Sequence, residues 1–131
     1  MIKTKSILSE INYTDGLRIS IMSKHTLNDG VTPHPDITSY SFDIWLPILS
    51  PPLKLVGDYY KRGLSWESFE KRYLEHIRKD YVKKEVKLLA EKGLDSMITL
   101  LCIEEFPFLC HRSILAKECK LYQPSLELYI N

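Results

Sequence analysis

Short apolar and alternating stretches of the chain predict four strands. Residues 17–23 alternate branched apolar side chains with polar ones, which is the period of a strand with one buried face. Residues 2–8 mix apolar and small polar positions, and residues 126–130 alternate near the end of the chain. Residues 97–103 are almost continuously apolar, which is typical of a central parallel strand covered by helices on both faces. We therefore expect residues 97–103 to occupy the middle of a sheet.

Between these strands, apolar residues recur at helical spacing and are separated by capping residues. Ser50 precedes two prolines and matches a helix start, and Gly63 is placed to end that helix in a left-handed conformation. Ser65 matches the cap of the next helix, and Gly93 matches the end of the helix that follows it. We interpret the aromatic-rich residues 40–49 as a short helix rather than a strand.

The order of these elements predicts the fold class. From residue 97 onward the pattern reads strand, helix, strand, with the helix expected after Cys110, and this is a βαβ unit. The predicted fold is an α/β domain with an open, mostly parallel sheet flanked by helices in a Rossmann-like, three-layer arrangement. A chain of 131 residues suits one core and is too short for two ordinary ones. We expect a single domain over residues 1–131.

Composition and charge narrow the class of protein. Hydrophobic residues make up 44% of the chain and charged residues 27%, as in ordinary folded domains. The net charge of +1 gives the whole molecule little attraction for nucleic acid or a membrane surface, so any anion site must be local. No apolar run approaches the roughly 20 residues that span a bilayer. Three cysteines without disulfide spacing, and a start without the apolar core of a signal peptide, favour a cytoplasmic location.

Reactive side chains are concentrated where the central strand ends and the last helix begins. Cys102 and Glu104 close the strand, and Cys110, His111 and Arg112 follow a turn. In open α/β sheets, ligands collect beyond the carboxyl ends of the strands, where the N-terminus of the next helix favours an anion. Arg112 adds a fork-shaped donor that suits phosphate or carboxylate. The sequence therefore predicts a polar pocket that binds an anion.

Cys110 is the first catalytic candidate in this pocket. A thiol at a helix start beside His111 and Arg112 should have its thiolate stabilised, and the alternative is a small residue that packs the turn. Glu104 is the candidate general acid or base, and its alternative role is to pair with Arg112 and organise the turn. His111 either donates to a ligand or caps backbone groups. Cys102 lies on the strand, and we expect it to line the pocket as a buried, unreactive thiol.

Two further candidates follow residues 17–23. Lys24 and His25 would face the same crevice if the strand at 17–23 and the strand at 97–103 are neighbours in the sheet. On that condition we count both as ligand-binding residues.

The same residues include potential metal ligands, and the chain lacks the common catalytic motifs. Cys102, Cys110, His111 and Cys119 are four potential metal ligands, but structural zinc draws its ligands from short paired units that this chain lacks. We therefore expect no metal and no cofactor. No glycine-rich phosphate loop, His-Glu-x-x-His helix or Gly-x-Ser-x-Gly elbow is present, which removes the commonest nucleoside triphosphatase, metalloprotease and hydrolase assignments.

The stretch Leu101-Cys102-Ile103-Glu104, followed by Pro107 and Cys110-His111-Arg112, resembles the signature of the family catalogued as domain of unknown function 488, which includes YeaO-like proteins. The early strand, the central helices and the closing strand-helix-strand unit are also similar to that family. The resemblance implies a compact α/β domain with a pocket at these motif positions, and it implies no particular activity.

The chain departs from that family pattern in its early strand. Many relatives carry an Asp-x-Arg or Asp-Arg sequence at the end of the strand, whereas this chain has Met22-Ser23-Lys24-His25 there. If that Asp is needed for a shared reaction, this chain either lacks the reaction or uses Asp29, Asp36 or another group instead.

These observations favour a small cytoplasmic enzyme or enzyme-like protein. It would act on a phosphate- or nucleotide-related anion through the strand-end pocket. The alternative is a binding module without catalysis, whose partner is a nucleic acid or a protein. A basic face continuous with the pocket would favour the module, and a pocket in which Cys110, Glu104 and Arg112 converge would favour the enzyme.

Overall fold

The computed structural model describes residues 1–131 and contains one open, five-stranded sheet. The strands lie in the order β3-β2-β4-β1-β5, and every neighbouring pair is parallel. β4 is therefore the middle strand, as its continuous apolar sequence predicts. The strands are β1 (Ile2–Ser6), β2 (Leu17–Ser20), β3 (Ile44–Trp45), β4 (Ile98–Cys102) and β5 (Leu128–Tyr129).

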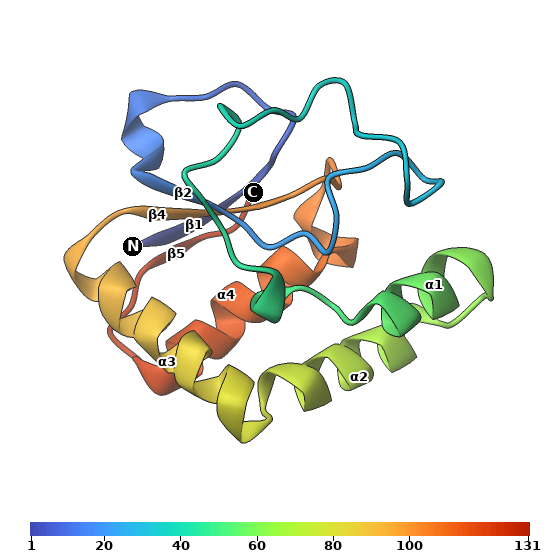
Figure 1. Ribbon diagram of the computed structural model, residues 1–131. Coiled ribbons are helices and arrows are strands. Elements are labelled where there is room, and N and C mark those ends of the chain that lie inside the picture. Colours follow the sequence, from blue (N-terminus) through green and yellow to red (C-terminus); the bar gives the residue numbers. More distant parts are fainter.

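Four α-helices accompany the sheet: α1 (Leu53–Lys61), α2 (Trp66–Ile77), α3 (Asp80–Asp95) and α4 (His111–Tyr122). Three short 3-10 turns are η1 (Tyr13–Asp15), η2 (Pro47–Leu49) and η3 (Pro107–Leu109). Figure 1 shows the four helices gathered on one side of the sheet, while η1 and long loops lie on the other. The sheet thus lies between a helical layer and a loop layer, and the predicted α/β class with an open parallel sheet is confirmed. None of the helices is long and apolar enough to cross a membrane.

Alternation along the strands sends different chemistry to the two faces of the sheet. Ile19, Ile98 and Leu100 belong to the large apolar core under the helices. Burying such an aliphatic side chain contributes roughly 1.5–3 kcal/mol. Arg18 and Thr99, one position along each strand, are buried on the other face, where the Thr99 hydroxyl donates to the backbone oxygen of η1 at 2.7 Å. One face is therefore an apolar core and the other holds buried polar groups.

Two of the predicted helix boundaries are confirmed, and one is wrong. The side chain of Ser65 accepts a hydrogen bond from the backbone N–H of Ser68 and caps α2. Gly63 has a φ of 73° just after α1, the left-handed conformation that glycine adopts without strain. The N-cap of α1 is Pro52, not Ser50, because the Ser50 hydroxyl turns back to donate to the carbonyl of residue 47.

The structure corrects two further predictions. Residues 40–49 form no α-helix: Ile44 and Trp45 pair with β2 as an edge strand, and only residues 47–49 form a 3-10 turn. Gly93 does not end its helix, since α3 continues to Asp95. A Cβ at Gly93 would lie 2.8 Å from the Ile2 side chain, so this glycine allows α3 to approach the sheet closely.

The carboxyl ends of β1, β2 and β4 meet at one edge of the sheet. Ser20 lies opposite Leu101, and Ser6 lies opposite Cys102. The adjacency of the early strand and the central strand, on which the membership of Lys24 and His25 in the pocket depends, is thereby confirmed. This edge is the place that the sequence assigns to ligand binding.

Candidate active site

Two thiols and an imidazole converge at the end of β4. Cys102 is the last residue of β4, Cys110 is the N-cap of α4, and His111 is the first residue of that helix. The segment 103–109 loops out between them and includes η3. One donor atom from each of the three side chains lies within 4.8 Å of the other two. We call these three residues the thiol cluster.

The hydrogen bonds of His111 define which of its ring nitrogens carries a proton. Nε2 lies 2.7 Å from the backbone oxygen of Ile21, just beyond the end of β2. A carbonyl oxygen only accepts hydrogen bonds, so Nε2 carries the hydrogen and donates it. In the neutral ring Nδ1 is then unprotonated, and it lies 3.6 Å from Cys102 Sγ. His111 is therefore oriented as a proton acceptor for the Cys102 thiol.

The surroundings of Cys102 stabilise its thiolate. The hydrogen bond from the Cys110 thiol, the backbone N–H of Glu104 and the positive charge of Arg112 together lower the pKa of Cys102, although burial opposes them. Each of these groups interacts more favourably with a charged sulfur than with a neutral one. Cys102 is thus the thiol of the pair that releases its proton first.

The surroundings of Cys110 act in the opposite direction on its thiol. Burial, followed by the neighbouring Cys102 sulfur, raises the pKa of Cys110 well above its ordinary value, and His111 only partly offsets this. The groups that favour a thiolate act on Cys102, the strand residue whose sulfur lies 3.6 Å from the imidazole. Cys110 serves it as a hydrogen-bond donor. These two shifts favour Cys102 over Cys110 as the more acidic thiol of the pair.

Arg112 is also placed differently from the expectation. Its side chain is fully buried, and its guanidinium donates to the backbone oxygens of Glu104 at 2.7 Å, Glu105 at 3.2 Å and Asn131 at 3.2 and 3.3 Å. The fork predicted to hold a phosphate or carboxylate is thus occupied by carbonyls. Arg112 fixes segment 103–109 and the end of the chain, and it contributes its charge to the thiol cluster from behind.

Glu104 extends towards α1 and not towards Arg112. Its carboxylate accepts a hydrogen bond from the Tyr60 hydroxyl, so the proposed pairing of Glu104 with the guanidinium is not formed. Burial of the hydroxyl and the carboxylate beside it raise the pKa of Tyr60, and the nearby Cys102 and Cys110 add to this effect. The contact joins α1 to the segment that separates the two thiols.

Lys24 and His25 lie outside the thiol cluster. The Lys24 ammonium donates to the backbone oxygen of Gly30 within its own loop. His25 Nε2 lies 2.6 Å from the Ser20 hydroxyl, and its ring stacks on Phe42 with centroids 4.8 Å apart. Burial lowers the pKa of His25, which favours a neutral ring. The two residues follow β2 as expected, but Lys24 bonds within its own loop and His25 packs against Phe42 and the end of β2.

The cluster is covered rather than open. Cys102 and Cys110 are 5% and 2% exposed, and they pack in a small apolar group with Ile7, Met22 and Ile37. The polar pocket predicted at this point is therefore a buried cluster at the base of loops. Access of a ligand to the sulfur requires these side chains or segment 103–109 to move.

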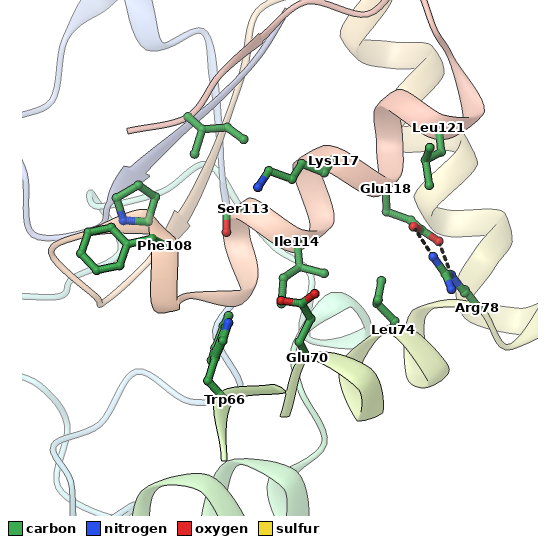
Figure 2. A pocket seen from close by; sticks show the side chains of 12 residues that line it. Trp66, Glu70, Leu74, Arg78, Phe108, Ser113, Ile114, Lys117, Glu118 and Leu121 are labelled. Carbon is green, nitrogen blue, oxygen red and sulfur yellow. Dashed lines mark hydrogen bonds and ion pairs between the residues drawn. The ribbon is translucent and has the colours of Figure 1, made fainter. Parts of the chain in front are cut away.

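An open groove of about 370 Å³ lies on the other side of α4. Figure 2 shows Trp66 and Phe108 at one end near Ser113, and the Arg78–Glu118 ion pair at the other. The Ser113 hydroxyl donates to the Cys110 backbone oxygen at 2.9 Å, so one end of the groove adjoins the start of α4. Sequence patterns did not indicate this groove.

A comparison with protein families matches most of the chain. The model described as DUF488-N3a, the active DUF488-N3 subclade, matches residues 2–122. The chain belongs to the DUF488 family. This range includes the whole thiol cluster, Glu104 and Arg112. No curated protein and no solved structure matches the chain.

In this DUF488 domain the residues of the Cys-x-Glu and Cys-His-Arg motifs divide into two groups. Cys102, Cys110 and His111 bring their side-chain donor atoms within 4.8 Å of one another, whereas Arg112 binds backbone oxygens. The donor atoms of the first group are of the kind that zinc prefers, and their convergence shows that adjacent Cys110 and His111 can reach one point. The group holds three such donors.

Three residues of the DUF488 site were missed in the sequence. Ile21 contributes only a carbonyl, which no side-chain pattern reveals. Tyr60 reaches Glu104 from α1, and Tyr73 packs its ring edge-on to His111 with centroids 5.4 Å apart. The helical apolar stripe that contains Tyr73 placed it in the core, and its position under the imidazole follows from the packing of α2 against α4.

Proposed function

We propose that this DUF488 protein is a thiol-dependent enzyme that acts on a phosphate- or nucleotide-related anion, with Cys102 as its reactive group. The observation that supports this most directly is the alignment of Cys102 Sγ, His111 Nδ1 and the Ile21 carbonyl. A nucleophile, a base within reach of its proton and a third group that orients the base are the parts required for nucleophilic catalysis. The family description of an active subclade is consistent with this proposal.

Proton transfer in the cluster proceeds from Cys102 to His111. The imidazole takes the thiol proton on Nδ1 and becomes a cation, while its Nε2–H remains bonded to Ile21. The resulting thiolate accepts the Cys110 thiol hydrogen and the Glu104 N–H. Glu104 and Tyr60 form a second proton-bearing pair close to the sulfur, which supports a general acid–base role for Glu104.

The proposed anionic ligand is supported by the start of α4. The backbone N–H groups of His111 and Arg112 make no hydrogen bond, and they lie at the positive end of the helix. The buried Arg112 charge adds to the same potential. An anion therefore binds backbone groups, and the guanidinium contributes without touching it.

The proposed nucleotide character of the ligand rests on two exposed aromatic rings. Phe106 and Phe108 are 58% and 68% exposed and stack on each other with centroids 5.7 Å apart. Both lie in the segment between Cys102 and Cys110. An exposed aromatic platform suits a planar base, and stacking on such a ring is worth about 1–3 kcal/mol per base.

Site-resolved alkylation tests the reactive thiol. Native protein is treated with iodoacetamide at several pH values, and the modified cysteines are located by mass spectrometry. We expect Cys102 to be labelled first and His111→Gln to slow its labelling at neutral pH on the order of tenfold, because the thiolate loses its base and counter-ion.

Cys119 is the internal control for this experiment. It is fully buried in α4, and burial raises its pKa to about 12, so it should label last. The Cys119→Ser variant should keep the wild-type rate at Cys102. Labelling of Cys102 no faster than Cys119, or no response to His111→Gln, would rule out the activated thiol.

A thermal-shift screen separates the enzyme from the alternative, a nucleic-acid-binding module. Inorganic phosphate, mononucleotides and short oligonucleotides are compared in wild type and in Phe108→Ala. A shift by mononucleotides that falls in Phe108→Ala supports the proposal. A rise in melting temperature with oligonucleotides alone favours the binding module, which the exposed phenylalanine pair also supports. No rise with any probe counts against both the enzyme and the module.

A further inference from the structure

Cys110 is more than a hydrogen-bond donor to Cys102, because its sulfur is close enough to form a covalent bond after oxidation. We propose that Cys102 and Cys110 are a peroxide-reactive pair, in which Cys102 is oxidised to a sulfenic acid and Cys110 then closes a reversible disulfide. The inference rests on the proposed function only in using the same Cys102 thiolate. It assigns a modification site, and hydrogen peroxide or an organic hydroperoxide as the chemical class that modifies it.

The geometry of the pair carries this proposal. The two sulfurs lie within 4.8 Å of each other. A disulfide needs a sulfur–sulfur distance of about 2.05 Å, so the sulfurs must approach by a few ångströms at most. The two cysteines flank segment 103–109, whose phenylalanines are largely exposed, so this segment can adjust without disturbing the main core.

Each step of the chemistry balances. The Cys102 thiolate attacks one peroxide oxygen; a sulfur–oxygen bond forms, the oxygen–oxygen bond breaks, and the sulfur gives up two electrons to the peroxide. The departing alkoxide or hydroxide takes a proton, which the His111 imidazolium can supply. The Cys110 sulfur then attacks the sulfenic sulfur; a disulfide forms, the sulfur–oxygen bond breaks, and the Cys110 proton leaves with the hydroxide as water.

The two sulfurs are chemically suited to their different roles. Cys102 has the thiolate character that reaction with peroxide requires, whereas Cys110 remains a protonated thiol that can supply the proton lost with water. Apolar side chains cover the pair, which admits a small peroxide more readily than a bulky oxidant. A buried sulfenic acid next to a second thiol condenses with it before it is oxidised further.

The sequence provides a direct assay for this bond. Tryptic cleavage after Lys92 and Arg112 places Cys102 and Cys110 on one peptide, residues 93–112, while Cys119 falls on another. Reduced native protein is treated with hydrogen peroxide, blocked with iodoacetamide and digested. We expect peptide 93–112 to lose two hydrogens, to carry no alkyl group, and to regain both thiols with dithiothreitol.

Variants distinguish this inference from the proposed function. In Cys110→Ser, and equally in Cys110→Ala, the sulfenic acid should persist on Cys102 and be trapped by dimedone. Cys119→Ser should leave the disulfide unchanged. Fast alkylation of Cys102 together with only sulfinic or sulfonic acid on peptide 93–112 would overturn the pair and leave the reactive thiol intact. Slow alkylation and no oxidation of Cys102 would overturn both.

Discussion

This domain contains two polar clusters that are both buried but differ in their chemistry. The Asp15 cluster is made of Asp15 and the three cations around it, Lys3, Lys5 and Arg18. The thiol cluster is buried to a similar degree, and both contain groups whose pKa is displaced. Displaced pKa values alone therefore do not identify the functional site.

The Asp15 cluster is electrostatically closed. Burial alone would raise the pKa of Asp15, but Lys3, the Asn12 N–H, Lys5 and Arg18 hold it well below its usual value. Its carboxylate lies 2.8, 3.0 and 2.5 Å from the three cationic nitrogens. The depressed pKa keeps Asp15 charged at neutral pH, and its ion pairs fasten η1 to the sheet.

The thiol cluster differs in both position and proton chemistry. It lies at the carboxyl end of β4, where parallel sheets bind ligands, whereas Asp15 precedes β2. Its two sulfurs and its imidazole lie within 4.8 Å of one another, and Cys102 Sγ lies 3.6 Å from His111 Nδ1. The comparison teaches that a buried cluster is a candidate active site when its charges can be redistributed, and a structural clasp when they are fixed.

The largest expected effect comes from opening the Asp15 cluster. Asp15→Asn leaves three buried cations around a neutral side chain, so we expect the free energy of unfolding to fall by about 3–5 kcal/mol. Denaturation in urea measures this loss. Cys102 should still be alkylated at the wild-type rate in the folded variant, because the two clusters are separate.

Two controls keep this prediction sharp. Asp29→Asn changes an exposed loop carboxylate and should alter stability far less. Lys3→Met removes the most exposed of the three cations and should fall between the two, which provides a folded variant if Asp15→Asn is too unstable to study. Equal losses in Asp15→Asn and Asp29→Asn would contradict the role given to the Asp15 cluster.

A smaller effect on stability is expected from acid pH, in the range where the carboxyl group of Asp15 titrates in the unfolded chain. The pKa of Asp15 is depressed in the folded protein, so below its ordinary value of 3.8 the unfolded chain takes up a proton that the folded protein does not. Stability therefore falls as pH decreases, by up to about 1.4 kcal/mol per pH unit for this proton. Urea denaturation across the acid range should show a shallower slope in Asp15→Asn. Identical slopes would contradict the prediction.

Much of the fold was predictable because local signals agreed with the tertiary structure. The continuous apolar run identified β4 as the central strand, and Ser65 and Gly63 act as the sequence indicates. β3 is only two residues long, too short to show alternation. Gly93 was misread because its purpose is close packing against Ile2, which lies far away in the sequence.

The candidate site was predictable in place but not in the role of each residue. The motif residues do gather at the strand end, yet the orientation of His111 depends on a carbonyl 90 positions earlier in the chain. Only the pairing of β2 with β4 brings Ile21 there, and the contact leaves Nδ1 of the neutral ring free to face Cys102. Likewise, no local pattern shows that the guanidinium of Arg112 donates to the backbone oxygen of Asn131.

The smallest expected effect tests how the thiol cluster is covered, a feature that the Asp15 cluster does not need. Tyr60→Phe removes the hydrogen bond to Glu104 and loosens segment 103–109 from α1. A net loss of about 0.5–1 kcal/mol from this bond would raise the alkylation rate of Cys102 about two- to fivefold through local opening. Tyr59→Phe is the matched control, since it deletes the same atom from the neighbouring residue, whose hydroxyl forms no hydrogen bond within the protein. If Cys102 is alkylated at the same rate in both variants, the Tyr60–Glu104 contact does not restrict access to it. If only Tyr60→Phe reacts faster, and the pH midpoint of its alkylation rate is unchanged, the contact acts on access and not on the charge of the sulfur.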